Sequence, residues 1–338
     1  MPTFSNRSFA PNRRFALKAV AGAALAPLGL PAAFAADDKY PSKAITYVVP
    51  FTPGGATDII GRIYSVSLAQ MFDSSVVVEN SGGTGGSLGS AKVARAKPDG
   101  YTLVGGTISS HAINVSIYPS IGYDPVKSFE PIILTGTLPN VLLVKAGGPL
   151  KSVADVIAAG KKPGSKLSFG SSGVGSSQHL AGELFKMMTG AEMLHVPYKG
   201  SAPSLQALIA GEIDLLFDNI TSGITFVNSG HLSPLAVTSL TVSPQLPNVK
   251  PLDQLGLPGY EVVSWQATFA PAGTPKPVID KLYQAMAATL QKPEVRKQLV
   301  SLGVDISGDG PQKLQEFQIK EVAKWAQVAR KANIKLDS

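Results

Sequence analysis

The chain has 338 residues, of which 30 are Lys or Arg, 23 are Asp or Glu and none is Cys. The lack of cysteine excludes disulfides, thiolate metal sites and a lipid-modified cysteine. Four basic residues and no acidic ones fall in the first 35 positions, so the rest carries 26 basic against 23 acidic residues. A net charge of about +3 without clustering does not favour nucleic-acid binding.

The first 35 residues have the composition of an export signal. Basic residues (Arg7, Arg13, Arg14 and Lys18) precede an apolar stretch at 19–30 and the small-x-small site Ala33-Phe34-Ala35. This pattern predicts a signal peptide at 1–35 that is cleaved after Ala35, leaving a soluble protein outside the cytoplasm. The arginine pair is compatible with both the twin-arginine and the general secretory route.

Short β-branched runs alternate with amphipathic helical runs, which predicts α/β architecture with parallel strands covered by helices. A first strand is expected at 45–49, followed by a turn and a helix for which Thr57 is a candidate N-cap. A second strand at 76–78 leads through a glycine-rich turn into a helix at 87–96. About 300 mature residues exceed the usual size of one core, so two lobes are expected.

A second set of units begins after Pro139 with the apolar run 141–144. Its expected helices span 153–162, 177–189 and 202–210, with strands near Leu167, Met193 and Ile213. A later strand at 262–269 precedes helices at 276–291 and 312–331, which lack a sheet of their own and are expected to cover the first lobe. The predicted lobes are therefore 36–137 with 262–338, and 138–261.

Three turns, at 53–58, 80–89 and 171–177, place glycines and small hydroxyl residues between the end of a strand and the start of a helix. Ligands bind at this position in open α/β sheets, because the first N–H groups of a helix lack intrahelical partners and attract anions. Glycine also lets a ligand approach the backbone. Each turn alone is explained equally well by the need for a tight turn.

One of these turns contains the pattern G-x-S-x-G at 85–89, which is typical of the serine nucleophile in α/β hydrolases. A serine esterase or hydrolase using Ser87 is therefore an alternative function. Such an enzyme needs a histidine late in the chain, whereas the four histidines lie at positions 111, 179, 195 and 231. The sequence favours a protein that is not an enzyme.

Motifs for nucleotide or zinc-protease sites are absent from the sequence. His179 and Glu183 have i, i+4 spacing, but two ligands do not make a metal site. His195 is compatible with a hydrogen-bonded structural role or with ligand contact. We therefore expect no metal and no cofactor.

Taken together, the strings of this sequence resemble those of one family, the periplasmic receptors of tripartite tricarboxylate transporters, also called Bug receptors. The resemblance runs through strings in a fixed order over the mature chain. They lie at 40–43, 49–58, 80, 85–86, 97–103, 111–114, 172–176, 195–200, 210–214, 217–218 and 269–275.

The resemblance implies a two-lobed periplasmic binding protein of the Venus-flytrap type, with a mainly parallel sheet flanked by helices in each lobe. It also implies a soluble, monomeric periplasmic receptor that closes on a small mono- or dicarboxylate and delivers it to integral-membrane transporter subunits. A sensor that presents the ligand to a signalling receptor is an alternative. Nucleic acid is not an expected partner.

Site residues are carried over from the same resemblance, and they cluster in the strand-end turns. The family commonly has a basic residue where this chain has Ser81 and an alanine where it has Thr84, and it usually has glycine in place of Ala267, so the identity of the acid stays open. An aromatic acid is one alternative, because Phe51, Tyr198 and Trp265 are candidates to flank it. The expected ligand contacts are Phe51, Pro53, Gly54, Gly55, Thr57, Asp58, Gly85, Gly86, Ser87, Ser109, His111, Ser172, Val174, Gly175, Ser176, Ser177, Tyr198, Lys199 and Asp218.

Overall fold

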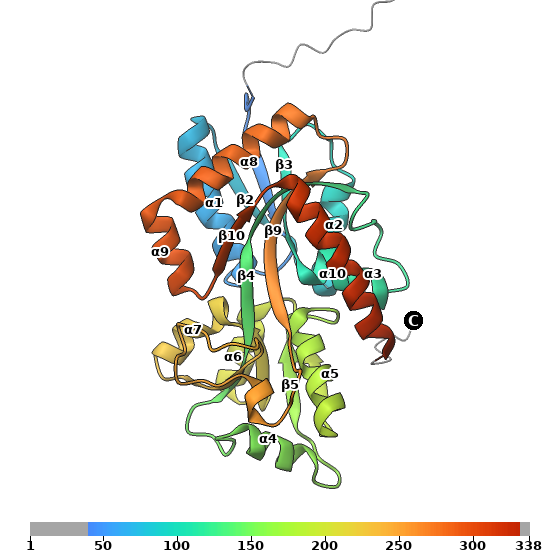
Figure 1. The fold of residues 1–338 in the computed structure, drawn as a ribbon, viewed down its shortest axis with the longest axis vertical. Coiled ribbons are helices and arrows are strands. Elements are labelled where there is room, and N and C mark those ends of the chain that lie inside the picture. Colours follow the sequence, from blue (N-terminus) through green and yellow to red (C-terminus); the bar gives the residue numbers. More distant parts are fainter. Residues whose placement is uncertain (1–39, 332–338) are drawn as a thin grey trace, which may run out of the picture. The chain divides into compact units, whose positions relative to one another are not determined.

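The structure is a computed structural model that describes residues 40–331. The signal peptide expected at residues 1–35 lies outside the described residues. Within the described range the ten strands form one sheet in the order β2-β1-β3-β9-β4-β7-β5-β6, with β10 and β8 also paired to β4. Figure 1 shows these strands and the helices that cover them.

The first lobe is built on three parallel strands near the N-terminal end of the described range. They are β1 (Ile45–Val49), β2 (Val76–Asn80) and β3 (Thr102–Thr107), with helices α1 (Ala56–Phe72), α2 (Ser87–Ala94) and α3 (Asn114–Ile117). Helix α1 begins one residue before Thr57, with Gly55 at the N-cap, so Thr57 is not the cap. The Thr57 hydroxyl instead donates a hydrogen bond of 2.9 Å to Gln266 Oε1.

Two long antiparallel strands, β4 (Phe129–Lys145) and β9 (Val263–Pro271), run from one lobe to the other. The lobe boundary that the sequence suggested near Pro139 falls inside β4, where Pro139 is opposite Val263. Proline interrupts a strand only by removing one N–H donor. A strand can therefore continue through Pro139 from one lobe to the other.

The second lobe repeats the parallel arrangement. Its strands β5 (Ser168–Ser171), β6 (Leu194–Pro197) and β7 (Leu215–Asn219) are parallel, and β8 (Leu232–Val237) is antiparallel to β4. Its helices are α4 (Val153–Gly160), α5 (Ser177–Thr189), α6 (Ser201–Ala210) and α7 (Ile220–Asn228). A 3-10 turn, η3 (Leu252–Leu255), precedes β9.

The chain then returns to the first lobe through α8 (Lys276–Gln291), α9 (Pro293–Ser301), β10 (Asp305–Asp309) and α10 (Pro311–Lys331). Apolar residues of α8 pack with those of α1 and β1 in one buried cluster, as the sequence indicated, and α9, which was not predicted from the sequence, joins the same cluster. Strand β10, which pairs antiparallel with β4, was not anticipated, because its residues Asp305–Asp309 lack an apolar alternation.

The two-lobed α/β fold expected from the sequence is thus present, with helices over the sheet in each lobe. Parallel pairing holds within β1, β2 and β3 and within β5, β6 and β7, whereas the pairs made by β4 and β9 are antiparallel. The sheet is therefore mixed where the lobes join. The chain crosses from one lobe to the other in β4 and returns in β9, so these two strands run in opposite directions.

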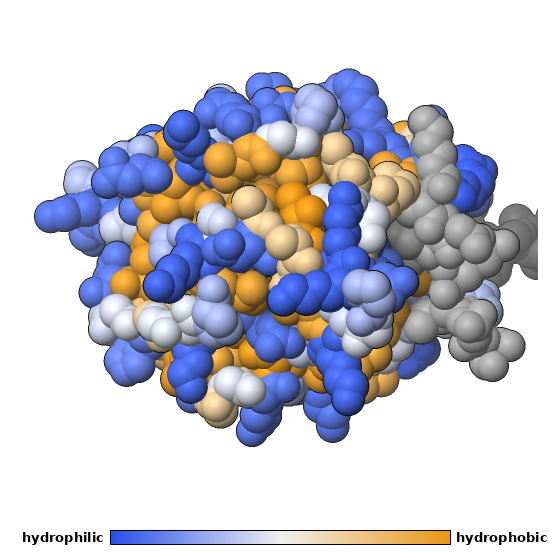
Figure 2. All heavy atoms as spheres, turned by 90° about the horizontal axis from the view of Figure 1, so that it is seen from below, coloured by the Kyte–Doolittle hydropathy of each residue, from blue (hydrophilic) through white to orange (hydrophobic). Residues whose placement is uncertain are grey.

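Among residues 40–331 there is no helix with the length and apolarity needed to cross a bilayer. Figure 2 shows one face of the molecule, on which hydrophobic residues reach the surface among hydrophilic ones. Exposed single apolar side chains are ordinary on a protein surface.

Candidate ligand cleft

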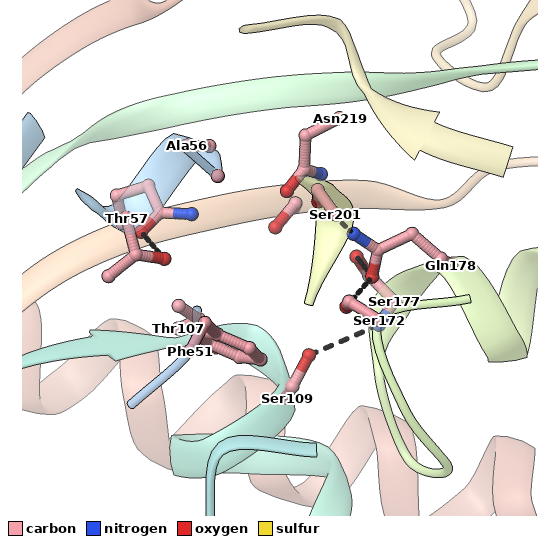
Figure 3. A pocket seen from close by; sticks show the side chains of 13 residues that line it. Phe51, Ala56, Thr57, Thr107, Ser109, Ser172, Ser177, Gln178, Ser201 and Asn219 are labelled. Carbon is pink, nitrogen blue, oxygen red and sulfur yellow. Dashed lines mark hydrogen bonds between the residues drawn. The ribbon is translucent and has the colours of Figure 1, made fainter. Parts of the chain in front are cut away.

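A cavity of about 20 Å³ lies where the two lobes meet, and ten of its thirteen lining residues have neutral polar side chains. Figure 3 shows hydroxyl and amide side chains from both lobes pointing toward one another around it. A volume this small admits about one water molecule, so the lobes are close together in this structure. The lining residues are Phe51, Gly55, Ala56, Thr57, Thr107, Ser109, Ser172, Ser177, Gln178, Ser201, Asn219, Ser264 and Gln266.

Four helices begin at this cavity. Helices α1, α5 and α6 contribute residues of their first turn to the lining, and Asn219 is the residue before α7. The first N–H groups of a helix have no intrahelical partner and carry a partial positive charge. A neutral cavity surrounded by four helix starts therefore favours an anion without a side-chain cation in its lining.

The lobes also touch directly beside the cavity. Tyr118 Oη donates a hydrogen bond of 2.8 Å to the carbonyl oxygen of Val174, and the Ser177 N–H donates one of 3.1 Å to Ser109 Oγ. Tyr118 and Ser109 belong to the first lobe, whereas Val174 and Ser177 belong to the second. These two bonds join the lobes in a closed arrangement.

Asp218, at the end of β7, lies behind the lining of the second lobe. Its Oδ1 accepts hydrogen bonds of 2.7 Å from Ser201 Oγ and 3.1 Å from Gln178 Nε2, and its Oδ2 is buried with no partner. Burial raises the pKa of Asp218 to about 6, against the hydrogen bonds, which lower it. The carboxyl group therefore sets the orientation of two side chains that face the cavity.

Six of the residues expected from the sequence line the cavity: Phe51, Gly55, Thr57, Ser109, Ser172 and Ser177. They come from the turns after β1 and β5 and from the π-helical turn η2 (Ser109–Ile113). Six others are in the loops where the lobes meet or at the adjoining helix starts, outside the lining: Gly85, Gly86, Ser87, Val174, Gly175 and Ser176. Pro53, Gly54, Asp58, His111, Tyr198, Lys199 and Asp218 are also outside the lining.

The carboxylate of Asp58 faces its own turn. It accepts hydrogen bonds from the Gly54 N–H, Arg62 Nε and Asn80 Nδ2, each at 2.9 Å. Burial acts to raise the pKa of Asp58, but these donors and the Arg62 charge outweigh it and lower that pKa. Asp58 therefore fixes the turn at 53–58, from which Gly55 reaches the cavity.

His111 and Ser87 are both buried in the first lobe. The His111 ring stacks on Phe269 at a centroid distance of 4.2 Å, and burial lowers the pKa of His111 to about 3. Ser87 Oγ accepts a hydrogen bond of 2.8 Å from Asn114 Nδ2. The hydroxyl that the hydrolase hypothesis requires is thus paired with an amide, and imidazole activation would require a different arrangement.

Seven lining residues are not among the individually expected contacts, although Ala56 lies in the turn at 53–58 that the sequence singled out: Ala56, Thr107, Gln178, Ser201, Asn219, Ser264 and Gln266. The helix-start argument could have found Gln178, Ser201 and Asn219, because each sits at the beginning of a helix that follows a strand. Ser264 and Gln266 come from the crossing strand β9, and no local signal marks them as cleft residues.

Comparison with known proteins places this chain in a family. Residues 60–334 match the model described as the tripartite tricarboxylate transporter family receptor. The chain belongs to this family. A relative from Pseudomonas sp. (strain P51), described as a UPF0065 protein in the tcbD-tcbE intergenic region, is 39% identical over 291 residues, covering 85% of this chain and 86% of that protein.

Solved structures of similar sequence share the fold of this receptor. The periplasmic binding protein BugD is 35% identical, with a TM-score of 0.84, and covers 88% of this chain and 100% of its own. An R. palustris protein solved with adipate is 38% identical, with a TM-score of 0.85 and the same coverage. MatC from Rhodopseudomonas palustris, solved with bound malate, is 30% identical, with a TM-score of 0.82, covering 86% of this chain and 99% of its own.

Proposed function

We propose that this chain is a periplasmic solute-binding receptor that captures a small mono- or dicarboxylate in the cleft between its lobes. The observation that carries the proposal is the neutral polar cavity at which four helices begin. Helix N-termini and hydroxyl groups stabilise a carboxylate without a buried ion pair. The relatives solved with adipate and with malate support the same class of ligand.

The binding step is closure of the two lobes around the acid. We assign 36–137 with 262–338 to the first lobe and 138–261 to the second, with β4 and β9 as the strands that bend. The cavity of the closed arrangement seen here is lined from both lobes, so a ligand enters an open form and is held as the lobes close around it. The six lining residues expected from the sequence and the seven found in the structure are the proposed contacts.

The partners in this proposal are the integral-membrane subunits of a tripartite transporter, which receive the acid from the closed, monomeric receptor. The family description supports this partnership. The basic and apolar composition of residues 1–35 supports export to the periplasm. We propose no catalytic step.

A thermal-shift screen of the mature protein, residues 36–338, with adipate, malate and a panel of other organic acids tests the ligand class. An acid present at 100 times its dissociation constant should add about 2.7 kcal/mol to the free energy of unfolding. Titration calorimetry on each hit should give one site per chain. A broad carboxylate panel without any shift would contradict the proposal. Esterase activity that disappears in S87A would favour the hydrolase alternative instead.

A further inference from the structure

Three aromatic rings form a stack beneath the loop at 172–176 of the second lobe. Phe169 of β5, His195 of β6 and His179 of α5 lie in this order, with centroid distances of 4.9 Å and 4.1 Å and interplanar angles of 26°. Phe169 is fully buried and His179 is 7% exposed. The stack thus holds the His179 ring in one place under the loop that joins β5 to α5.

The ring nitrogens of both histidines contact that loop. His179 Nδ1 accepts a hydrogen bond of 3.3 Å from the Gly175 N–H, and His195 Nε2 lies 2.7 Å from Ser171 Oγ. Ser171 Oγ in turn accepts a hydrogen bond of 3.1 Å from the Gly173 N–H. Because an N–H can be accepted only by a nitrogen with a free lone pair, His179 is unprotonated at Nδ1 in this arrangement.

The loop needs this support because of its own sequence. Gly173 and Gly175 have φ angles of 121° and 78°, in the region that glycine enters freely and from which it also leaves freely. The same loop supplies Ser172 to the cavity and presents the Val174 carbonyl oxygen to Tyr118 of the first lobe. A displacement of the loop would therefore disturb both the cavity lining and the contact between the lobes.

The charged groups around His179 act against its protonation. Burial lowers the pKa of His179 to about 3, helped by His195 and Lys186. Burial, with Lys186, lowers the pKa of His195 to about 4. Glu183 is the acidic group nearby, 4.0 Å from His179 Nε2, and Lys186 engages it at 2.9 Å. At neutral pH both rings are uncharged, which is the state in which Nδ1 accepts the Gly175 N–H.

We propose that His179 is a positioning residue of the ligand site, whose unprotonated Nδ1 holds Gly175 and with it the loop 172–176 in the conformation that binds the ligand. This inference rests on the proposed carboxylate-binding function. A proton on Nδ1 would remove the acceptor and release the loop, and the low pKa of His179 confines this to pH values near 3. His179 acts on the ligand only through the loop, because its side chain is outside the cavity lining.

Two substitutions test separately the hydrogen-bond acceptor and the stacked ring of His179. In H179N the amide oxygen can take the place of Nδ1 as an acceptor that does not titrate, whereas H179F keeps the stacked ring and removes the acceptor. Titration calorimetry uses adipate, malate or whichever acid the screen identifies, at pH 7 and at pH 4.5. Loss of one hydrogen bond predicts an affinity about 3- to 10-fold lower for H179F at pH 7, with H179N close to wild type.

Between pH 7 and pH 4.5 the wild-type and H179N affinities should change in parallel, because the low pKa of His179, about 3, keeps Nδ1 unprotonated over this range while the ligand, His195 and Asp218 titrate equally in both proteins. Wild-type affinity in H179F at pH 7, or an H179N affinity as low as that of H179F, would overturn the proposal. H179L is measured beside H179F, so that a folding defect in either variant leaves the other to decide.

A readout without ligand keeps this proposal separate from the proposed function. In ¹⁵N spectra of the ligand-free receptor, the Gly175 amide should exchange faster with solvent in H179F and H179L than in wild type and H179N. An unchanged Gly175 amide would refute the positioning role even if an acid binds. Absence of binding by every acid, with the Gly175 effect present, would refute the ligand class alone.

Discussion

Tyr118 Oη donates a 2.8 Å hydrogen bond to the carbonyl oxygen of Val174, so a side chain that follows α3 in the first lobe contacts the loop between β5 and α5 of the second. Under the proposed closure, an open form would lack this bond. The bond would then add its free energy to ligand binding and little to the folding of either lobe.

The substitution Y118F should lower ligand affinity about 3- to 10-fold, the equivalent of one hydrogen bond, with little change in the unfolding midpoint of the ligand-free protein. Titration calorimetry and thermal unfolding give the two quantities. Y123F is the matched control, because Tyr123 Oη donates to the Ser110 carbonyl oxygen within the first lobe. Equal affinity losses in both variants would contradict a specific contribution of the Tyr118–Val174 hydrogen bond to closure of the lobes.

Gly85 offers a steric test of closure. Its φ is 57°, and a Cβ atom at this position would collide with the Val174 carbonyl oxygen of the other lobe. G85A should lower ligand affinity at least about 10-fold, because backbone atoms on both sides leave little room for adjustment. G259A has a similar left-handed φ of 80° with nothing within 4 Å of the added carbon, so it controls for backbone strain. Similar affinities in the two variants would argue against closure at this contact.

Asp218 predicts a pH-dependent difference in stability. Burial raises its pKa from 3.8 to about 6, so the protonated form is favoured by folding. The stabilisation from protonation is fully present below pH 3.8 and is lost as the pH rises to about 6. Relative to wild type, D218N should therefore gain up to about 3 kcal/mol in its free energy of unfolding between pH 3.5 and pH 7. Urea unfolding at both pH values measures the gain. If the two proteins differed by the same free energy of unfolding at both pH values, the pKa of Asp218 would not be raised by folding.

Glu321 receives the indole N–H groups of both tryptophans in the chain. Its Oε2 accepts hydrogen bonds of 3.0 Å from Trp265 and 3.1 Å from Trp325, which ties β9 to α10. E321A leaves two buried donors without a partner and should lower the free energy of unfolding by about 3 kcal/mol. Tryptophan fluorescence during urea unfolding measures the loss. E316A, an exposed position of the same helix, should change it by less than about 0.5 kcal/mol.

The strand-end turns were predictable from sequence because they depend on local rules. Glycines after an apolar run and before an amphipathic run indicate a helix start with free N–H groups, and Gly55, Ser172 and Ser177 line the cavity for this reason. Helix α8 and strand β1 have the bounds that their apolar patterns indicate. The order of the family's strings also predicted the two-lobed fold.

The remaining part of the site depends on which strands run between the two lobes and how they pair. Gln266 and Ser264 reach the cavity only because β9 runs antiparallel between β3 and β4, a pairing that joins residues more than 100 positions apart. Asp58 carries the same kind of side chain as Asp218, but it turns to its own loop and to Arg62, whereas Asp218 orients Gln178 and Ser201. The sequence by itself determined the class of fold through its alternating apolar patterns and the family's strings, and it indicated anion-ready helix starts through local backbone donors. Only the tertiary structure decided which side chains share the cavity, because long-range strand pairing and burial set their direction.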